Sequence, residues 1–170
     1  AGLAVGAAVN GDASAGQLAV VAREFTSVTA ENAMKWRSLA AGPDSYDFSS
    51  ADQLVDFAIA NGQRVRGHTL FWHRLNGLPG WLDEELANAD DPAARLQALM
   101  AAHTATVVGR YAGRLAQWDV INEPLTLVGG GFDPENIFYQ HLGEDYLDFA
   151  LLRAHAADPS AELFINETFI

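Results

Sequence analysis

The sequence predicts an α/β fold built on a parallel β-sheet, and three observations support this prediction. Short apolar runs rich in Val, Ile, Phe and Leu alternate with longer segments of helical period. These runs start near residues 3, 25, 64, 116 and 163, so 170 residues divided among five runs give 34 residues per unit. Hydrophobic residues make up 49% of the chain, with only 15 Gly and 6 Pro, which is typical of a globular protein.

Five strands are expected, each short and apolar enough to be buried on both faces of a sheet. They span residues 3–9, 25–29, 64–70, 116–121 and 163–165. Eight units of 34 residues would need roughly 270 residues, close to the ~250 of a closed (β/α)8 barrel. The chain is therefore expected to form a partial (β/α)8 TIM barrel of about five parallel strands and four helices, which it does not close alone.

Four helices are expected between these strands, each marked by residues that begin a helix. Asp12 or Ser14 can cap the first helix, and Asp91 before a proline opens the third. Ser49 with Asp52 three residues later predicts a capping box at the start of the second helix. The fourth helix runs from about residue 143 to 157. The expected buried positions are Leu18, Val21, Ala22 and Phe25 in the first helix, Leu96, Leu99, Met100, Val107 and Tyr111 in the third, and Tyr146, Leu147, Ala150 and Leu152 in the fourth.

Charge and composition exclude several classes of function. Ten Lys and Arg residues against 22 Asp and Glu give a formal charge of −12, so nucleic acids and anionic membranes would repel the chain. With no Cys, disulfides, thiolate nucleophiles and zinc–thiolate sites are excluded. No apolar stretch is long enough to span a membrane, and no signal-peptide pattern is present. Because the first residue is not Met, the chain is expected to be processed, trimmed or a fragment.

The most informative segment is WDVINEP, residues 118–124, in which an apolar strand delivers Asn122 and Glu123 to its C-terminal end. Parallel α/β folds place their catalytic groups at this end of the strands. A Glu that is partly desolvated beside Trp118 would stay protonated near neutral pH and could act as a general acid. The alternative interpretation is a helix cap or an exposed loop carboxylate.

A second cluster, RGHTLFWH at residues 66–73, also ends a predicted strand. Trp72 offers a flat apolar face and a neutral His offers a donor, so this cluster could hold a sugar ring. His68 and His73 are five residues apart without an adjacent Asp, Glu or Cys, which is not a familiar metal-ligand spacing, so we expect no metal site. The alternative is that these are structural histidines. No role is assigned to His103, His141 or His155.

A third cluster, TAENAMKW at residues 29–36, follows the second predicted strand. Glu31, Asn32 and Lys35 together supply an acceptor, a donor and a charge, which suits a polyhydroxylated ligand. The alternative is a solvated start of a helix. Because all three clusters lie directly after strands, we expect them to converge on one face of the parallel barrel.

Together the three clusters strongly resemble glycoside hydrolase family 10, the endo-1,4-β-xylanases, which are retaining enzymes with a (β/α)8 barrel. The matching segments, in order, are TSVTAEN with MKW, VRGHTL with WH, and WDVINE, supported by YDF, LPGW, VGRY and GEDY. The resemblance covers nearly the whole chain. It implies that residues 1–170 are the N-terminal part of a catalytic barrel, with about five of its eight units.

The resemblance implies endo-hydrolysis of β-1,4-xylosidic bonds in xylan by retaining double displacement. Glu123 would be the acid/base, protonating the glycosidic oxygen and then activating water. Asn122 would hydrogen-bond the 2-hydroxyl of the sugar at the cleavage point. His68 and Trp72 would line the same subsite, with His73 in a supporting place.

The resemblance also implies the partners of the protein. Glu31, Asn32 and Lys35 would bind the next sugar on the non-reducing side of xylan or a xylo-oligosaccharide. No cofactor or metal is implied, and the family suggests secretion. A cis peptide bond between His68 and Thr69 is implied as well.

Some residues depart from the family pattern. Ala33 stands where a polar residue is usual, and residues 74–76, RLN, replace a Ser-Gln stretch. Residues 166–169, NETF, replace Asn-Asp-Tyr-Asn, which puts the leaving-group side of the cleft in question. The nucleophile, a second carboxylate about 5 to 5.5 Å from the acid/base, would lie on the seventh strand, beyond residue 170. Glu167 matches a different family position and is a poor substitute.

The missing nucleophile affects the expected activity of the chain, and other functions stay open. The remainder of the barrel is expected to be needed for activity, so the isolated chain is expected to be inactive. The other candidate functions are a related β-glycanase, such as a cellulase or mannanase, and a non-catalytic carbohydrate-binding half-barrel.

Overall fold

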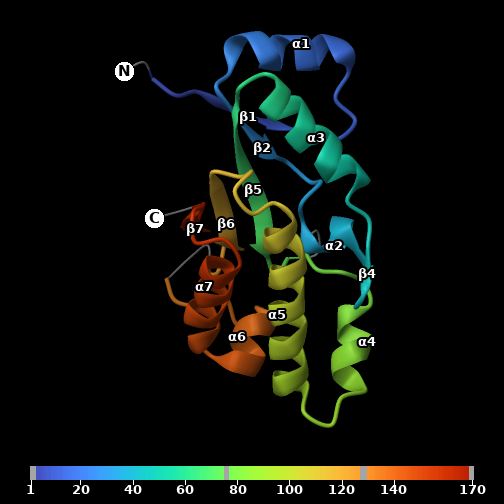
Figure 1. Cartoon of the computed structure of the whole chain (residues 1–170). Helices are drawn as coiled ribbons and strands as arrows, with labels where there is room; N and C mark the ends of the chain where they lie inside the picture. The colour runs from blue at the N-terminus through green and yellow to red at the C-terminus, as the bar shows by residue number, and fades with distance from the viewer. Residues whose placement is uncertain (1–2, 75–76, 127–129, 169–170) are drawn as a thin grey trace.

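The main sheet has five parallel strands that follow one another along the sheet in chain order in the computed structural model (Figure 1). The structure describes residues 3–74, 77–126 and 130–168. Leu75, Asn76 and Phe169, which depart from the family pattern, lie outside these residues. All neighbouring strands pair in parallel, which confirms the predicted α/β fold. The strands are β1 (Gly6–Val9), β2 (Ser27–Ala30), β5 (Arg64–Phe71), β6 (Gln117–Asn122) and β7 (Glu162–Asn166).

Four long helices correspond to the four predicted ones: α1 (Ala15–Glu24), α3 (Ser49–Ala60), α5 (Pro92–Arg110) and α7 (Asp145–Ala157). The described residues also contain three short helices outside the four expected ones, because four to six residues are too few to show a helical period. The acidic run at residues 83–85 indicates a helix start, and α4 begins there. These are α2 (Trp36–Leu39), α4 (Leu82–Ala87) and α6 (Ile137–Leu142). A small antiparallel pair, β3 (Ala40–Gly42) and β4 (Ser45–Tyr46), precedes α3.

The helix starts follow the predicted caps in two of three cases. Ser14 caps α1 and takes part in a capping box, and the Asp91 side chain accepts a hydrogen bond from the first turn of α5. The predicted capping box of α3 is wrong. Ser49 is already helical, and its backbone N–H donates to the carboxylate of Asp47 at 2.8 Å. Because Asp47 satisfies this free N–H from outside the helix, Asp52 is available to form an ion pair with α5.

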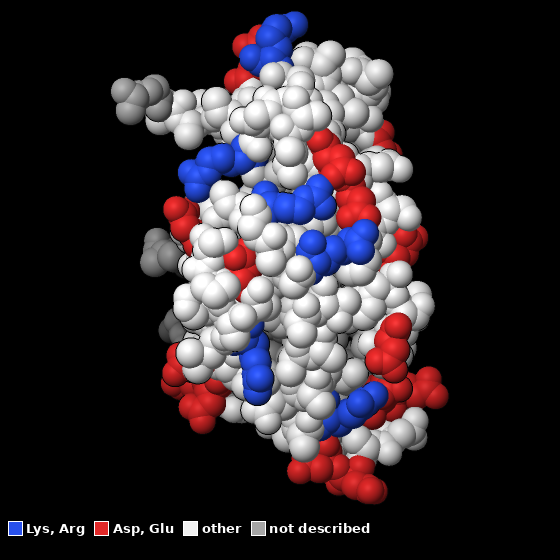
Figure 2. Space-filling model, in the orientation of Figure 1, with Lys and Arg blue, Asp and Glu red and all other residues white. Residues whose placement is uncertain are grey.

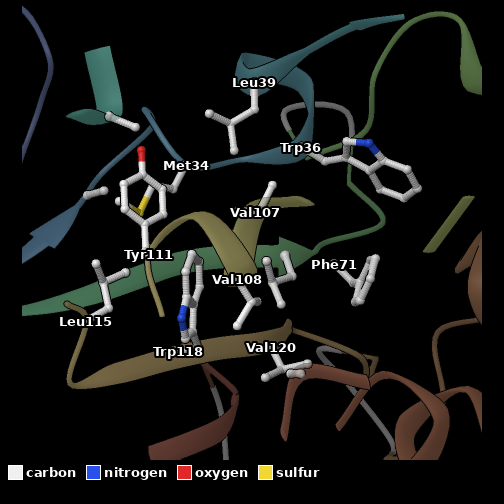
Figure 3. Close-up of a cluster of buried hydrophobic side chains, with 14 of the residues drawn as sticks. Met34, Trp36, Leu39, Phe71, Val107, Val108, Tyr111, Leu115, Trp118 and Val120 are labelled. Carbon is white, nitrogen blue, oxygen red and sulfur yellow. The ribbon is translucent and has the colours of Figure 1, made fainter. Parts of the chain in front are cut away.

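The core lies between the sheet and the helices on its outer face, and Trp118 is at its centre (Figure 3). Figure 3 shows the Trp118 ring of β6 beside Tyr111, which directly follows α5. Both side chains are fully buried. On the adjacent strand, a Cβ added to Gly67 would lie 2.2 Å from the Trp118 ring, so only glycine leaves room for it.

One predicted core position is wrong, since Leu152 of α7 is 68% exposed. The helix buries Tyr146, Ala150 and Ala154, which are four residues apart and therefore share one face. Leu152 lies midway between two of them along the chain, which places it on the opposite side of the helix.

The inner face of the sheet is open, in contrast to the covered outer face. A hollow of about 660 Å³ exposes polar side chains from three strands, including Thr29, Arg66 and Gln117. In a closed barrel these side chains would point into a packed interior. The five strands thus form about half of a barrel.

Figure 2 shows Lys and Arg interspersed with Asp and Glu over the face viewed in Figure 1. Some of these charges pair: Arg110 of α5 bonds to Asp52 of α3 at 2.5 Å, and Arg114 pairs with Asp56. The first pair joins two helices on the outside of the sheet, and the second joins α3 to the turn after α5. Exposed pairs of this kind contribute about 1 kcal/mol or less each.

Candidate active site

The predicted site residues come together along the C-terminal edge of the sheet, where β2, β5, β6 and β7 end. Asn122 is the last residue of β6 and Glu123 follows it directly. Trp72 follows β5, and Lys35 follows β2 as the residue before α2. Parallel strands end at one edge, so clusters about 35 to 50 residues apart in sequence become neighbours in space.

Glu123 is held by groups on both of its carboxylate oxygens. The indole N–H of Trp72 donates to Oε2 at 3.0 Å, and the hydroxyl of Thr168 donates to Oε1 at 2.6 Å. The guanidinium Nε of Arg74 lies 3.2 Å from Oε2. The side chain retains 22% exposure, so it is accessible from solvent.

The backbone of Glu123 is unusual, because its φ of 50° lies in the left-handed region that non-glycine residues rarely adopt. Its N–H donates to the carbonyl of Asn166 at 2.8 Å, which fixes this turn to the adjacent strand. A strained residue at the end of a strand is typical of a functional site, where the surrounding structure enforces the conformation.

The prediction that Trp118 lies beside Glu123 is wrong. Trp118 is fully buried on the helix-covered face of the sheet. Side chains alternate between the two faces of a strand, and Trp118 belongs to the outward set. The tryptophan that contacts Glu123 is Trp72, from the neighbouring strand's loop.

His68 is oriented by a buried carboxylate that sequence reasoning missed. Its Nδ1 lies 2.9 Å from Oδ2 of Asp119, which also forms a two-point ion pair with Arg66. Burial acts to raise the pKa of Asp119, but the hydrogen bonds from His68 and Arg66 outweigh it and hold the pKa below its ordinary value. An ionised carboxylate only accepts, so Nδ1 of His68 carries the proton. The signal in the sequence was an Asp in the middle of an apolar strand.

The peptide bond between His68 and Thr69 is cis, as the resemblance implied. The hydroxyl of Thr69 donates to the carbonyl of Asp119 at 2.8 Å. The pairing of β5 with β6 changes register between His68 and Phe71, at the same place.

His73 is buried and its Nε2 lies 3.1 Å from Oδ2 of Asp133, while its Nδ1 has no hydrogen-bond partner. A hydrogen bond from the backbone N–H of Glu135 is the main cause that lowers the pKa of Asp133, and His73 and Arg74 add to it. Asp133 lies in the long segment after β6, where no sequence pattern identified it. His73 therefore joins the segment after β5 to the segment after β6 through Asp133.

The third predicted cluster is joined to the others through Lys35. Its Nζ donates to Oδ1 of Asn32 at 2.8 Å and lies 4.6 Å from the ring centre of Trp72. Burial lowers the pKa of Lys35, and the charges of Glu31 and Glu123 oppose this shift. A cation, an aromatic face and amide groups thus form one polar surface, which is suited to binding a sugar.

Asn122 and Glu167 have partners of their own. Oδ1 of Asn122, which is buried, accepts from Nδ2 of Asn166 at 2.7 Å. Oε2 of Glu167 accepts from the backbone N–H of Leu125 at 3.2 Å, so this carboxylate supports the loop after β6.

The described part of the chain contains neither a metal-ligand cluster nor a membrane-spanning helix. In residues 3–74, 77–126 and 130–168, no group of three or more His, Cys, Asp or Glu side chains could hold a metal ion. In the same part of the chain, no helix is long and apolar enough to cross a membrane.

Sequence comparison matches the chain to a family model and to proteins named as xylanases. The family model described as Glycosyl hydrolase family 10 matches residues 1–169. The chain is 42% identical over 145 residues to "Beta-1,4-xylanase" of Dictyoglomus thermophilum, covering 85% of this chain and 39% of that protein. It is 40% identical over 149 residues to "Endo-1,4-beta-xylanase 3" of Hypocrea jecorina, covering 88% of this chain and 40% of that protein.

Comparison with solved structures gives proteins of the same family. Xylanase 10B from Thermotoga petrophila RKU-1, solved in complex with xylobiose, superposes with a TM-score of 0.84 at 33% identity, over 96% of this chain and 49% of that one. A GH10 structure from Paenibacillus barcinonensis gives a TM-score of 0.86 at 33% identity, over 96% and 50%. The chain therefore spans half or less of the length of these relatives.

Proposed function

Because the chain belongs to glycosyl hydrolase family 10, we propose that it supplies the acid/base half of an endo-1,4-β-xylanase active site. The reaction is hydrolysis of β-1,4-xylosidic bonds by retaining double displacement, with the nucleophilic Glu contributed by residues after 170. The observation that best supports this proposal is Glu123. It stands at the C-terminal end of β6 with its carboxylate 3.0 Å from the Trp72 indole nitrogen and partly exposed.

In the first step Glu123 protonates the glycosidic oxygen as the C–O bond breaks. In the second step the same carboxylate takes a proton from the water that attacks the glycosyl-enzyme intermediate. One carboxyl can do both, because it returns to its starting protonation state after each cycle.

Substrate binding is assigned to the two other clusters. Asn122 donates from its amide to the 2-hydroxyl at the cleavage point, and His68 and Trp72 line that subsite. His68 is suited to this role because Asp119 fixes its ring, leaving Nε2 to form a hydrogen bond with a sugar hydroxyl.

The next sugar on the non-reducing side is assigned to Glu31, Asn32 and Lys35. The Lys35 ammonium lies over the Trp72 ring, so the two subsites share one wall. The ligand is a xylo-oligosaccharide or a xylan chain.

The decisive experiment compares Glu123→Gln with the unaltered full-length protein on xylo-oligosaccharides. We expect the variant to lose roughly 10²- to 10⁴-fold in kcat/KM, the usual contribution of a general acid. Asp56→Asn, on the outer face, is the matched control and should leave the rate unchanged. A variant as active as the unaltered protein would remove Glu123 from this role. Binding without turnover by the unaltered protein would favour a non-catalytic carbohydrate-binding function, and faster cleavage of a glucan or mannan would favour a cellulase or mannanase.

A further inference from the structure

Three donors surround the carboxylate of Glu123, and they differ in chemistry. Oε2 faces two nitrogen donors, the indole N–H of Trp72 at 3.0 Å and the guanidinium Nε of Arg74 at 3.2 Å. Oε1 faces one hydroxyl, that of Thr168 at 2.6 Å. Arg74 and Thr168 both stand at positions where this chain departs from the family pattern.

Arg74 is fixed in place from its other side. Its Nη2 lies 3.7 Å from Oδ2 of Asp133, the same oxygen that contacts His73. Asp133 is held in its ionised form by its hydrogen bonds, so it is a lasting anchor for the guanidinium. The Nε of Arg74 is itself buried and without a correctly angled hydrogen bond, which leaves the nearby Glu123 oxygen as its charge partner.

Donor chemistry distinguishes the two oxygens. An indole N–H and a guanidinium donate hydrogen bonds and cannot accept them, whereas a hydroxyl does both. A proton on Oε2 would compete with the N–H of Trp72 and would lie beside the positive charge of Arg74. A proton on Oε1 can be accommodated, because the Thr168 hydroxyl can rotate and accept.

We propose that Arg74 is a positioning residue that confines the acid proton of Glu123 to Oε1. This inference rests on the proposed function. Trp72 donates a hydrogen bond to Oε2, and the positive charge of Arg74, 3.2 Å away, favours negative charge on the same oxygen. The proton therefore leaves from Oε1 to the glycosidic oxygen as the C–O bond breaks, and the bonding electron pair stays with the departing oxygen. In the second step Oε1 receives the proton of the attacking water.

The test uses two substrates that differ in their need for a proton. The alkoxide leaving group of a xylo-oligosaccharide must be protonated, whereas 2,4-dinitrophenolate leaves a dinitrophenyl β-xylobioside without help. In the full-length protein, we expect Arg74→Leu to lower kcat/KM about ten-fold for the oligosaccharide and less than about two-fold for the aryl substrate. kcat/KM is the proper quantity because it reports only the step that expels the leaving group.

Three further variants sharpen the test. Arg74→Lys restores a cation that only donates and should keep the ratio of the two kcat/KM values within about three-fold of the unaltered protein. Arg74→Gln introduces an acceptor and should behave like the Leu variant. Arg110→Leu removes an ion pair to Asp52 on the outer face and should leave the ratio unchanged. Thermal unfolding identifies any variant that does not fold. If Arg74→Leu does not fold, the comparison of Arg74→Lys with Arg74→Gln tests the inference.

The outcomes separate this inference from the proposed function. Equal losses on both substrates would show a merely structural role for Arg74 and overturn the inference, as would no loss on either. If the unaltered protein cleaves neither substrate, the proposed function fails and the inference fails with it. If the unaltered protein cleaves both substrates and Arg74→Leu leaves the ratio of the two kcat/KM values unchanged, the proposed function stands and the inference alone is rejected.

Discussion

The middle and the edge of the sheet differ in how completely they are covered. In β6, all residues from Trp118 to Asn122 are buried, whereas in β1 only Val9 is buried. A hollow of about 700 Å³ lies along β1 and α1, and Val20 of α1 is 44% exposed beside it. The contrast shows that burial is most complete in the middle of the sheet, around the two strands that precede Trp72 and Glu123, and decreases toward β1.

The site follows the same division. Glu123 and His68, at the middle, have partners contributed by neighbouring strands and loops. Glu31, toward the edge, is exposed and also borders the hollow beside α1. Glu123 and His68 thus stand where the chain is well packed, and Glu31 stands where it is loosely packed.

We expect the difference between the middle and the edge of the sheet to have its largest effect on stability at Trp118. We expect Trp118→Ala to lower the free energy of unfolding by about 3–5 kcal/mol, because it empties a fully buried ring from the core. Val20→Ala, at the exposed edge, should cost less than about 1 kcal/mol. Urea unfolding of both variants measures the difference. Similar losses would mean that the edge is as well packed as the middle.

A second pair of variants adds volume instead of removing it. Gly67→Ala should destabilise by about 3 kcal/mol, because its Cβ would lie 2.2 Å from the immobile Trp118 ring. Gly16→Ala in α1 meets nothing within 4 Å and should stabilise by about 0.5–1 kcal/mol through its helix propensity. Opposite signs in a denaturant titration are the expected result. A neutral Gly67 variant would show that the ring can move aside.

The third effect depends on pH and concerns His103, which is fully buried in the middle region and stacks on Trp36 at 4.6 Å. Burial lowers its pKa to about 3, while the unfolded chain has a pKa of about 6.5. Because only the unfolded state takes up a proton between these values, the contribution of neutral His103 is complete above pH 6.5 and falls as the pH falls. Between pH 8 and pH 5 the loss is about 2 kcal/mol.

His103→Phe should remove this part of the pH dependence, as measured by denaturant unfolding at pH 8 and pH 5. Met100→Leu, at another fully buried position of α5 without a titratable group, should keep it. If the Phe variant retains the full slope, the acid sensitivity arises from other groups.

Much of the fold was predictable because its signals are local. Apolar runs and the helix caps Ser14 and Asp91 depend on residues close in sequence, and these predictions are confirmed. The short helices α2 and α6 were missed because four to six residues carry no clear period, and only the acidic run at residues 83–85 indicated the start of α4. Leu152 was assigned to the core because its hydrophobicity, and not its angle around the helix, guided the prediction.

Sequence alone determined that the three polar clusters end neighbouring parallel strands, because strand periodicity and chain order fix that edge. Only the tertiary structure decided the partners. His68 meets Asp119 because the two are opposed in the register of β5 and β6, 51 residues apart. Arg74 reaches Glu123 because two loops converge, and no spacing along the chain encodes that distance. Local pattern specifies which residues arrive at the edge, while strand register and loop packing specify which atoms they touch.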